Sequence, residues 1–143
     1  DVRQAPWKCG DFIIGKSTIT DFPACQWMSV NSGQVVRFTL TKEQIRECDL
    51  RIGITAGFAG GRPRVLINQW ESKLLAHVGQ PDSRSITIGT YRGHNVPYTF
   101  KVPAKALVEG ENKLIINVVS GRPGITFLSA GYAIDCVDLC PRK

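Results

Sequence analysis

The chain has 143 residues, of which 43% are hydrophobic and 21% charged, and this ordinary globular composition excludes wholesale disorder and collagen. No apolar run reaches the roughly 18 residues that a membrane-spanning helix needs. Lysine and arginine exceed aspartate and glutamate by 18 to 12, a net charge of +6. That moderate excess suits an acidic polysaccharide, an acidic protein surface or nucleic acid without deciding among them.

Short apolar segments, separated by turn signals, follow one another along the chain. Most of them alternate apolar and polar residues, which is the period-2 pattern of a half-buried strand. About nine strands at this spacing are typical of an all-β sandwich or barrel. In chain order we expect strands at Phe12–Ile14, Gln34–Leu40, Leu50–Phe58, Arg64–Gln69, Ser85–Thr90, Val96–Val102, Lys113–Val119, Ile125–Leu128 and Tyr132–Leu139.

Helical signals are confined to two short segments. Residues 41–48 are expected to form a short helix, because Thr41 is followed three residues later by Gln44, as in a capping box. Pro103–Leu107 is expected to form one further turn. Since strands and helices do not alternate, a parallel α/β sheet is excluded. We therefore predict an all-β fold, an antiparallel β-sandwich of the jelly-roll type, as a single domain over residues 1–143.

Five cysteines lie at positions that predict disulfides, namely Cys9, Cys25, Cys48, Cys136 and Cys140. No pair has the C-x-x-C spacing of a zinc or thioredoxin site, so we prefer a disulfide framework to buried, reduced cysteines. Such a framework implies a secreted, extracellular protein. If the first and last strands lie side by side, Cys9 reaches Cys136 or Cys140, and Cys25 is left for Cys48. Because five is odd, one thiol stays free or pairs between chains, and we expect a monomer rather than a covalent dimer.

Short stretches of the chain, read together and in order, match the pattern of a known family. They are Asp21-Phe22-Pro23, Leu50-Arg51-Ile52-Gly53, Ala56-Gly57-Phe58-Ala59-Gly60-Gly61-Arg62-Pro63-Arg64-Val65-Leu66-Ile67-Asn68, Ser83-Arg84, Gly89-Thr90-Tyr91-Arg92-Gly93, Val102-Pro103-Ala104, Glu109-Gly110-Glu111-Asn112 and Val118-Val119-Ser120-Gly121. Over residues 11–139 the chain resembles the C-terminal, carbohydrate-binding-module-like domain of fungal rhamnogalacturonan lyases, polysaccharide lyase family 4. The resemblance implies a jelly roll and a link to pectin. It does not imply lyase activity, because in that family the catalytic machinery lies in a separate N-terminal domain. The cysteines depart from the family pattern.

Catalytic and metal-binding signatures are not found in the sequence. The only histidines, His77 and His94, stand in no recognisable nucleophile motif. Asp135 and Asp138 are three residues apart, which puts them on opposite faces of a strand and argues against a carboxylate pair. Asp11, Asp135 and Asp138 could serve as hard oxygen ligands of a structural calcium ion, but no ligand spacing is diagnostic. We therefore expect no enzymatic activity, no metal site and no cofactor.

Arginines and aromatic residues near turns are the candidate binding groups. Guanidinium groups bind carboxylates in bidentate fashion, and flat aromatic rings suit the apolar faces of sugars. Trp27 and Tyr98 are better explained as core residues. The alternative interpretation is that the turn arginines are solvated, or that Arg62 and Arg84 pair with Asp49 or Asp82. The predicted ligand-binding residues are Arg62, Arg64, Trp70, Arg84, Tyr91, Arg92 and Arg122.

Two functional hypotheses of different classes follow. The first is a secreted, non-catalytic module that recognises acidic, pectic polysaccharide of the plant cell wall. The second is a secreted effector that binds or inhibits a host protein, such as a papain-like cysteine protease, through the glycine-rich loops Ala59–Arg64 and Ser120–Gly124. Fold alone does not decide between them. Neither nucleic acid nor a membrane is an expected partner, because no basic stripe with interleaved aromatics is present.

Overall fold

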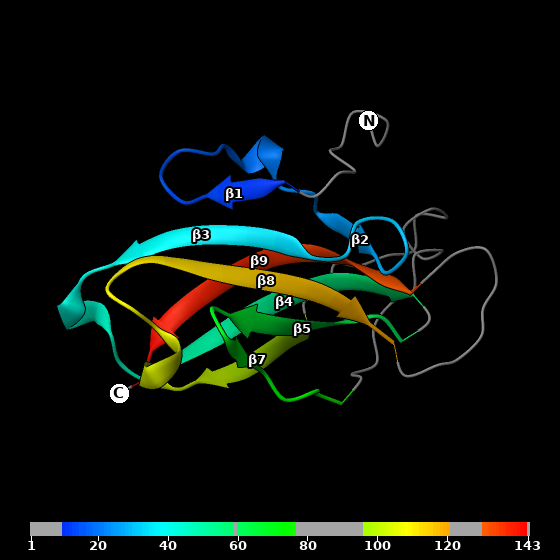
Figure 1. Ribbon diagram of the computed structural model, residues 1–143. Coiled ribbons are helices and arrows are strands. Elements are labelled where there is room, and N and C mark those ends of the chain that lie inside the picture. Colours follow the sequence, from blue (N-terminus) through cyan, green and yellow to red (C-terminus); the bar gives the residue numbers. More distant parts are fainter. Residues whose placement is uncertain (1–9, 59, 77–95, 121–129, 143) are drawn as a thin grey trace.

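Two β-sheets pack face to face in the computed structural model, which describes residues 10–58, 60–76, 96–120 and 130–142 (Figure 1). The first sheet has the strand order β1 (Asp11–Ile13), β3 (Gln34–Leu40), β8 (Gly110–Val119), β5 (Arg62–Ile67) and β6 (Trp70–Glu71). The second has the order β2 (Cys25–Trp27), β9 (Gly131–Pro141), β4 (Cys48–Phe58) and β7 (Val96–Val102).

The chain crosses repeatedly from one sheet to the other. It runs from β3 to β4 to β5, and later from β7 to β8 to β9, and each step changes the sheet. This wrapping is the arrangement expected of a jelly roll, and it confirms the predicted all-β sandwich. One pair departs from the antiparallel expectation: β1 lies parallel to β3. Because the chain passes through β2 in the opposite sheet between them, it can return in the same direction.

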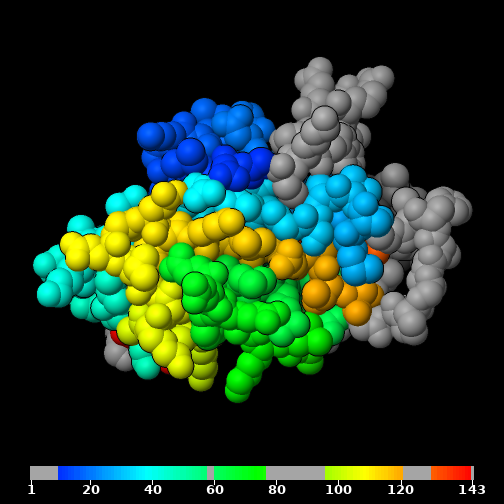
Figure 2. Space-filling model, viewed as in Figure 1, coloured from blue at the N-terminus to red at the C-terminus, as the bar shows by residue number. Residues whose placement is uncertain are grey.

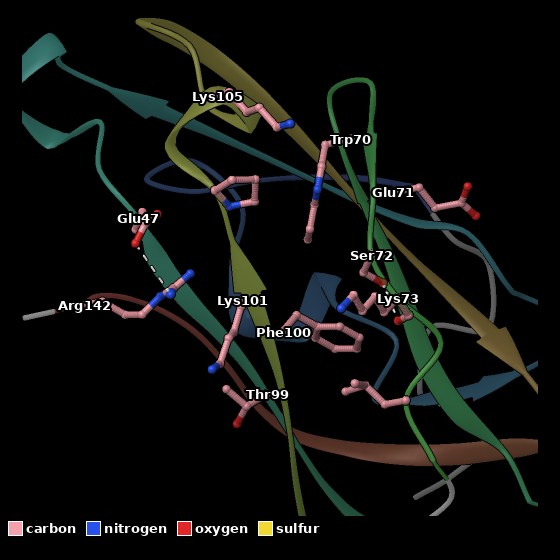
Figure 3. Close-up of a pocket in the computed structure, with 12 residues that line it drawn as sticks. Glu47, Trp70, Glu71, Ser72, Lys73, Thr99, Phe100, Lys101, Lys105 and Arg142 are labelled. Atoms are coloured by element: carbon pink, nitrogen blue, oxygen red, sulfur yellow. Dashed lines mark hydrogen bonds and ion pairs between the residues drawn. The ribbon is translucent and has the colours of Figure 1, made fainter.

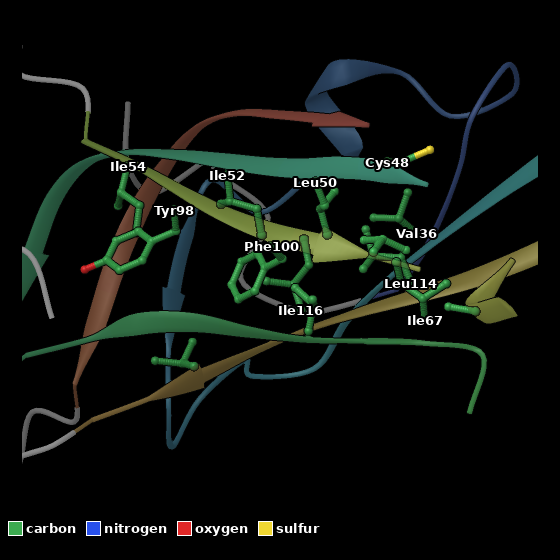
Figure 4. Packing of buried hydrophobic residues seen from close by; sticks show 14 of the residues in the cluster. Val36, Cys48, Leu50, Ile52, Ile54, Ile67, Tyr98, Phe100, Leu114 and Ile116 are labelled. Carbon is green, nitrogen blue, oxygen red and sulfur yellow. The ribbon is translucent and has the colours of Figure 1, made fainter. Parts of the chain in front are cut away.

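Alternating apolar residues of both sheets form the core between them (Figure 4). On β7 every second residue is buried, from Val96 to Val102, so Tyr98 and Phe100 point inward as the sequence predicts. Leu50, Ile52 and Ile54 of the neighbouring strand β4 lie beside them on the same face of the second sheet. The expectation that Tyr98 is a core residue is confirmed by its exposure of 2%, whereas Trp27 is only half-buried.

The helix predicted at residues 41–48 is wrong in extent. Only Lys42–Gln44 forms a turn, and it is a 3₁₀ turn. The side chain of Gln44 accepts the Thr41 N–H at 2.8 Å, so the capping signal is real. It cannot extend further because Cys48 belongs to β4, where it pairs with Val102 on one side and Pro141 on the other. Sheet pairing thus overrides the local helical preference.

Two further strands were not expected, and two expected segments cannot be compared. β2 and β6 have three and two residues, too short to show a period-2 pattern. Ser85–Thr90 and Ile125–Leu128 lie outside the described residues. The turn expected at Pro103–Leu107 is confirmed as the 3₁₀ turn η4 (Ala104–Ala106). A third such turn, η2 (Ile19–Asp21), follows β1.

The structure does not support the predicted disulfides among the four cysteines that it describes. Cys25, Cys48, Cys136 and Cys140 all carry free thiols, and Cys9 lies outside the described residues. The pairing of Cys25 with Cys48 is wrong, because Cys25 lies opposite Ala133 of β9 and Cys48 lies opposite Pro141. Eight residues of a strand span about 26 Å, far beyond the roughly 7 Å limit between the Cα atoms of a disulfide.

Gly61, just before β5, and Gly131, the first residue of β9, lie in close contact. A Cβ atom on Gly61 would lie 2.6 Å from the Gly131 nitrogen, and one on Gly131 would lie 2.6 Å from the Gln26 oxygen. Gly131→Ala is expected to lower the free energy of unfolding by about 3 kcal/mol, because the obstructing atoms include rigid backbone. Urea unfolding measures this. Gly10→Ala is the matched control, since nothing lies within 4 Å of that position. Equal stability of the two variants would contradict the close packing.

Candidate functional site

A cleft of about 590 Å³ opens between β6 and β7, which are edge strands of the two different sheets. Its apolar lining comes from Trp70, Leu75, Phe100 and Pro103 (Figure 3). On the surface, the green hairpin of β5 and β6 borders the yellow segment that follows β7 (Figure 2). The charged lining residues are Glu47, Glu71, Lys73, Lys101, Lys105 and Arg142.

Trp70 is held at the cleft by the hairpin that joins β5 and β6. Ile67 pairs with Trp70, so only Asn68 and Gln69 make the turn. Asn68 adopts a φ of 54°, a left-handed conformation that asparagine tolerates better than most residues. Its side chain donates to the Ala106 carbonyl at 2.8 Å and to Asn112 Oδ1 at 3.0 Å. These bonds fix the hairpin to η4 and β8, and with it the position of the indole.

One side of the Trp70 indole packs against the core, and the other side is accessible to solvent. Trp70 is half-buried and packs against the core cluster, while Phe100 below it is only 2% exposed. In Figure 3 the ring projects between Lys105 and Phe100, into the space between the two strands. A rigid aromatic surface with one open side is the group that apolar faces of a ligand stack upon.

The carboxylates in and beside the cleft form ion pairs with two arginines. Arg142 Nε lies 3.2 Å from Asp49 Oδ1, outside hydrogen-bond geometry, and Nη1 of the same side chain lies 3.6 Å from Glu47. Arg64 Nη2 lies 3.1 Å from Glu71. As partly exposed ion pairs these contribute little to stability, but the two arginines offset most of the negative charge of the three carboxylates.

Three ammonium groups remain at the rim. Lys73, Lys101 and Lys105 are exposed and form no ion pair with any carboxylate among the residues that the structure describes. Lys101 is the strand partner of Asp49 in the β4–β7 ladder, but the ion pair of the Asp49 carboxylate is with Arg142. The cleft therefore has a net positive charge beside an aromatic surface, a combination suited to an anionic ligand with apolar faces.

The sequence-predicted binding residues have different positions. Trp70 lines the cleft, and Arg64 lies beside it, where its Nε also donates to the Ser72 carbonyl at 3.3 Å. Arg62 is buried and donates to the carbonyls of Leu75 at 2.7 Å and Gly60 at 3.2 Å. The pairing of Arg62 with Asp49 is thus wrong. Outside the described residues lie Arg84, Tyr91, Arg92 and Arg122.

The lysines of the cleft were not singled out from the sequence. The residue pattern favours arginines in turns, whereas the cations that the fold brings together are Lys73, Lys101 and Lys105. One signal was available: Lys101 occupies a polar position of the alternating strand Val96–Val102, and Lys105 follows four residues later. Nothing in the sequence connects them to Trp70, because the contact forms between two sheets.

The aspartates considered for calcium do not lie together. Asp11 is on the first sheet, where it accepts a hydrogen bond from Arg37 at 2.6 Å. Together with Glu111 it raises the pKa of Arg37 through hydrogen bonds. Asp135 and Asp138 are on β9 of the second sheet. Among the described residues no three histidine, cysteine, aspartate or glutamate side chains are placed to hold a metal ion.

The two sheets form a β-sandwich, and the aromatic, cationic cleft lies at its edge. A family model described as "CBM-like: Polysaccharide lyase family 4, domain III" matches residues 1–139. The chain belongs to this family of domains, which confirms the resemblance drawn from the sequence.

The relatives of the chain are much longer proteins. Over 97% of its length it is 40% identical to rhamnogalacturonate lyase A of Aspergillus aculeatus and 37% identical to a putative rhamnogalacturonase of Neurospora crassa. Over 92% it is 42% identical to a probable rhamnogalacturonate lyase A of Aspergillus niger. The match covers 26%, 26% and 25% of these proteins respectively, so the chain spans about a quarter of their length.

Membrane insertion by a helix finds no support in the described part of the chain. None of its helices is long and apolar enough to cross a bilayer.

Proposed function

We propose that this chain is a non-catalytic, extracellular binding module for acidic plant cell-wall polysaccharide, and that the cleft between β6 and β7 binds the sugar. The observation that carries the proposal is the position of Trp70 beside three ammonium groups without ion-pair partners among the described residues. Support also comes from the family, a carbohydrate-binding-module-like domain, and from relatives named as rhamnogalacturonate lyases.

The binding mode follows from the chemistry of the two kinds of group. A pyranose ring has an apolar C–H face, and stacking that face on the indole removes both surfaces from water. The uronate carboxylates then lie near Lys101, Lys105 or Lys73, where the attraction is electrostatic. Because these lysines are exposed, their contribution depends on salt and acts mainly on selectivity for charged sugars.

The alternative function is the binding of a protein such as a papain-like protease. It requires that the glycine-rich loops present arginine side chains to the cleft of that protease. Arg62 is instead turned toward carbonyls of its own chain, and Ser120–Gly124 lies almost entirely outside the described residues. No observation on the described residues favours that function over glycan binding.

Isothermal titration with polygalacturonate and with rhamnogalacturonan tests the proposal. The matched control is polygalacturonate whose carboxyl groups are methyl-esterified, since it keeps the backbone and loses the charge. We expect binding to the free acid, weaker binding to the ester, and loss of the difference as ionic strength rises. Equal affinity for acid and ester would contradict charge recognition, and no binding to either would refute the proposed function.

A further inference from the structure

Among the described strands, β9 lacks a strand partner on one side over most of its length, and the segment from Phe12 to Phe22 lines a pocket beside its residues Ile134–Val137. β2 pairs only with Gly131, Tyr132 and Ala133, and the Ile134 N–H donates to the Ala24 carbonyl at 2.8 Å. Beyond that point β9 continues past β2 to Pro141, paired with β4 alone among the described strands (Figure 1). An open strand edge presents main-chain donors and acceptors that another strand can pair with.

The outward side chains of this open stretch form a short row. Leu139 and Val137 lie opposite the buried Leu50 and Ile52, so their neighbours along β9 point to the other face. The outward row is Cys136, Asp138 and Cys140.

Two of the three members of this row are cysteines. Cys136 and Cys140 are half-buried free thiols, and Arg51 Nη2 donates to Cys140 Sγ at 3.2 Å. Away from this row, burial raises the pKa of both Cys25 and Cys48.

The spacing of this row is self-complementary. If two copies pair antiparallel about a two-fold axis at Asp138, each Cys136 falls opposite Cys140 of the other copy. Directly opposed residues of antiparallel strands have Cα atoms about 4.5–5.5 Å apart, which lies within the roughly 4.4–6.8 Å that disulfides span. Pro141 has no N–H to donate, so the shared ladder ends there.

The charges of the row also fit a second copy. The two Asp138 carboxylates would face each other, but each has its own Arg51 Nη2 at 3.8 Å. The resulting order across the joint sheet is guanidinium, carboxylate, carboxylate, guanidinium, which has no net charge. In place of the monomer expected from the sequence, we propose that a second copy of this chain docks edge to edge on β9, and that Cys136 of each copy forms a disulfide with Cys140 of the other.

Formation of each disulfide requires an oxidant, and a disulfide such as oxidised glutathione can serve as one. One protein thiolate attacks a sulfur of the oxidant, forms a mixed disulfide and releases one glutathione thiolate. The facing thiolate of the second copy then attacks the protein sulfur and releases the other glutathione thiolate. For each bridge, two protein thiols lose two protons and two electrons, and one oxidised glutathione becomes two reduced molecules.

Two single variants, Cys136→Ser and Cys140→Ser, test the register, both in a Cys9→Ser background. Each is incubated with oxidised and reduced glutathione, alone and as an equal mixture, and the products are separated on a non-reducing gel and weighed by mass spectrometry. We expect no dimer from either variant alone, because the one cysteine left in the row then faces serine, and Cys25 and Cys48 lie outside the row. The mixture should form a heterodimer with one bridge, lighter than the two reduced chains by two hydrogens.

The mixture also controls for folding, since a variant that is silent alone but reacts in the mixture is intact. The Cys9→Ser parent should form a dimer with two bridges, lighter by four hydrogens. A dimer from either single variant alone would show that the thiols meet without the proposed register and would overturn it. Failure of the mixture to form the heterodimer would overturn it as well.

Discussion

Replacing Trp70 by alanine is expected to weaken the binding of polygalacturonate about 10- to 100-fold, which corresponds to about 1.4–2.8 kcal/mol. The variant removes the aromatic surface on which the sugar is proposed to stack, and it leaves the lysines at the rim in place. Isothermal titration against the unchanged protein measures the loss. Because Trp70 also packs against the core, a parallel thermal melt must show how much of the effect comes from stability.

Two further substitutions at this position separate stacking from packing. Trp70→Leu keeps an apolar side chain against the core but has no flat face, so it should bind as weakly as alanine while melting closer to the parent. Trp70→Tyr keeps a ring and should recover most of the affinity. Full affinity in the leucine variant would refute stacking.

The contribution of charge is tested with a matched pair of lysine variants. Lys105→Gln removes one charge at the cleft, and Lys113→Gln removes one from the exposed face of β8, outside the cleft lining. Only the first should lower the affinity for the free acid, and the difference should diminish at high salt. An equal effect of both would mean that net charge alone attracts the polymer.

Replacing Asn112 by alanine is expected to lower the free energy of unfolding by about 3 kcal/mol, because several buried polar groups lose their partner at once. Asn112 is 0% exposed. Its oxygen accepts the Val108 N–H at 2.9 Å and Asn68 Nδ2 at 3.0 Å, while its amide donates to the carbonyls of Val108 at 2.9 Å and Gly110 at 3.1 Å. Urea unfolding measures the loss.

The same variant should also reduce glycan binding, since Asn68 holds the hairpin that presents Trp70. Lys113→Ala, at the next and exposed position of β8, is the control and should change stability little. Combining Asn68→Ala with Asn112→Ala should cost less than the sum of the two, because they share a hydrogen bond. Strict additivity would show that the two asparagines act independently.

Several elements were predictable because their signal is local. The alternation of Gln34–Leu40 and of Val96–Val102 predicts both strands with the bounds that the structure has. It also predicts the inward direction of Tyr98 and Phe100, since a strand places every second side chain on one face. The class of fold follows from many such segments without intervening helices.

Other features depend on contacts between distant residues. Thr41 and Gln44 make the capping contact that the sequence indicates, yet pairing of Cys48 with both neighbours in the second sheet confines the helix to one turn. Likewise no spacing rule could place Cys25 and Cys48 at opposite ends of β9. The register between strands is set by the packing of whole strand faces, and not by whether two residues, such as two cysteines, could form a bond.

The candidate site divides in the same way. The all-β sandwich, the family and the choice of Trp70 as a candidate could be predicted, because composition, alternation and ordered motifs are properties of the linear chain. The position of Trp70 beside Lys101 and Lys105, and the inward direction of Arg62 toward carbonyls, became visible in the folded molecule. The physical reason is that the cleft forms between the edges of two sheets, so its members become neighbours only when the sandwich closes.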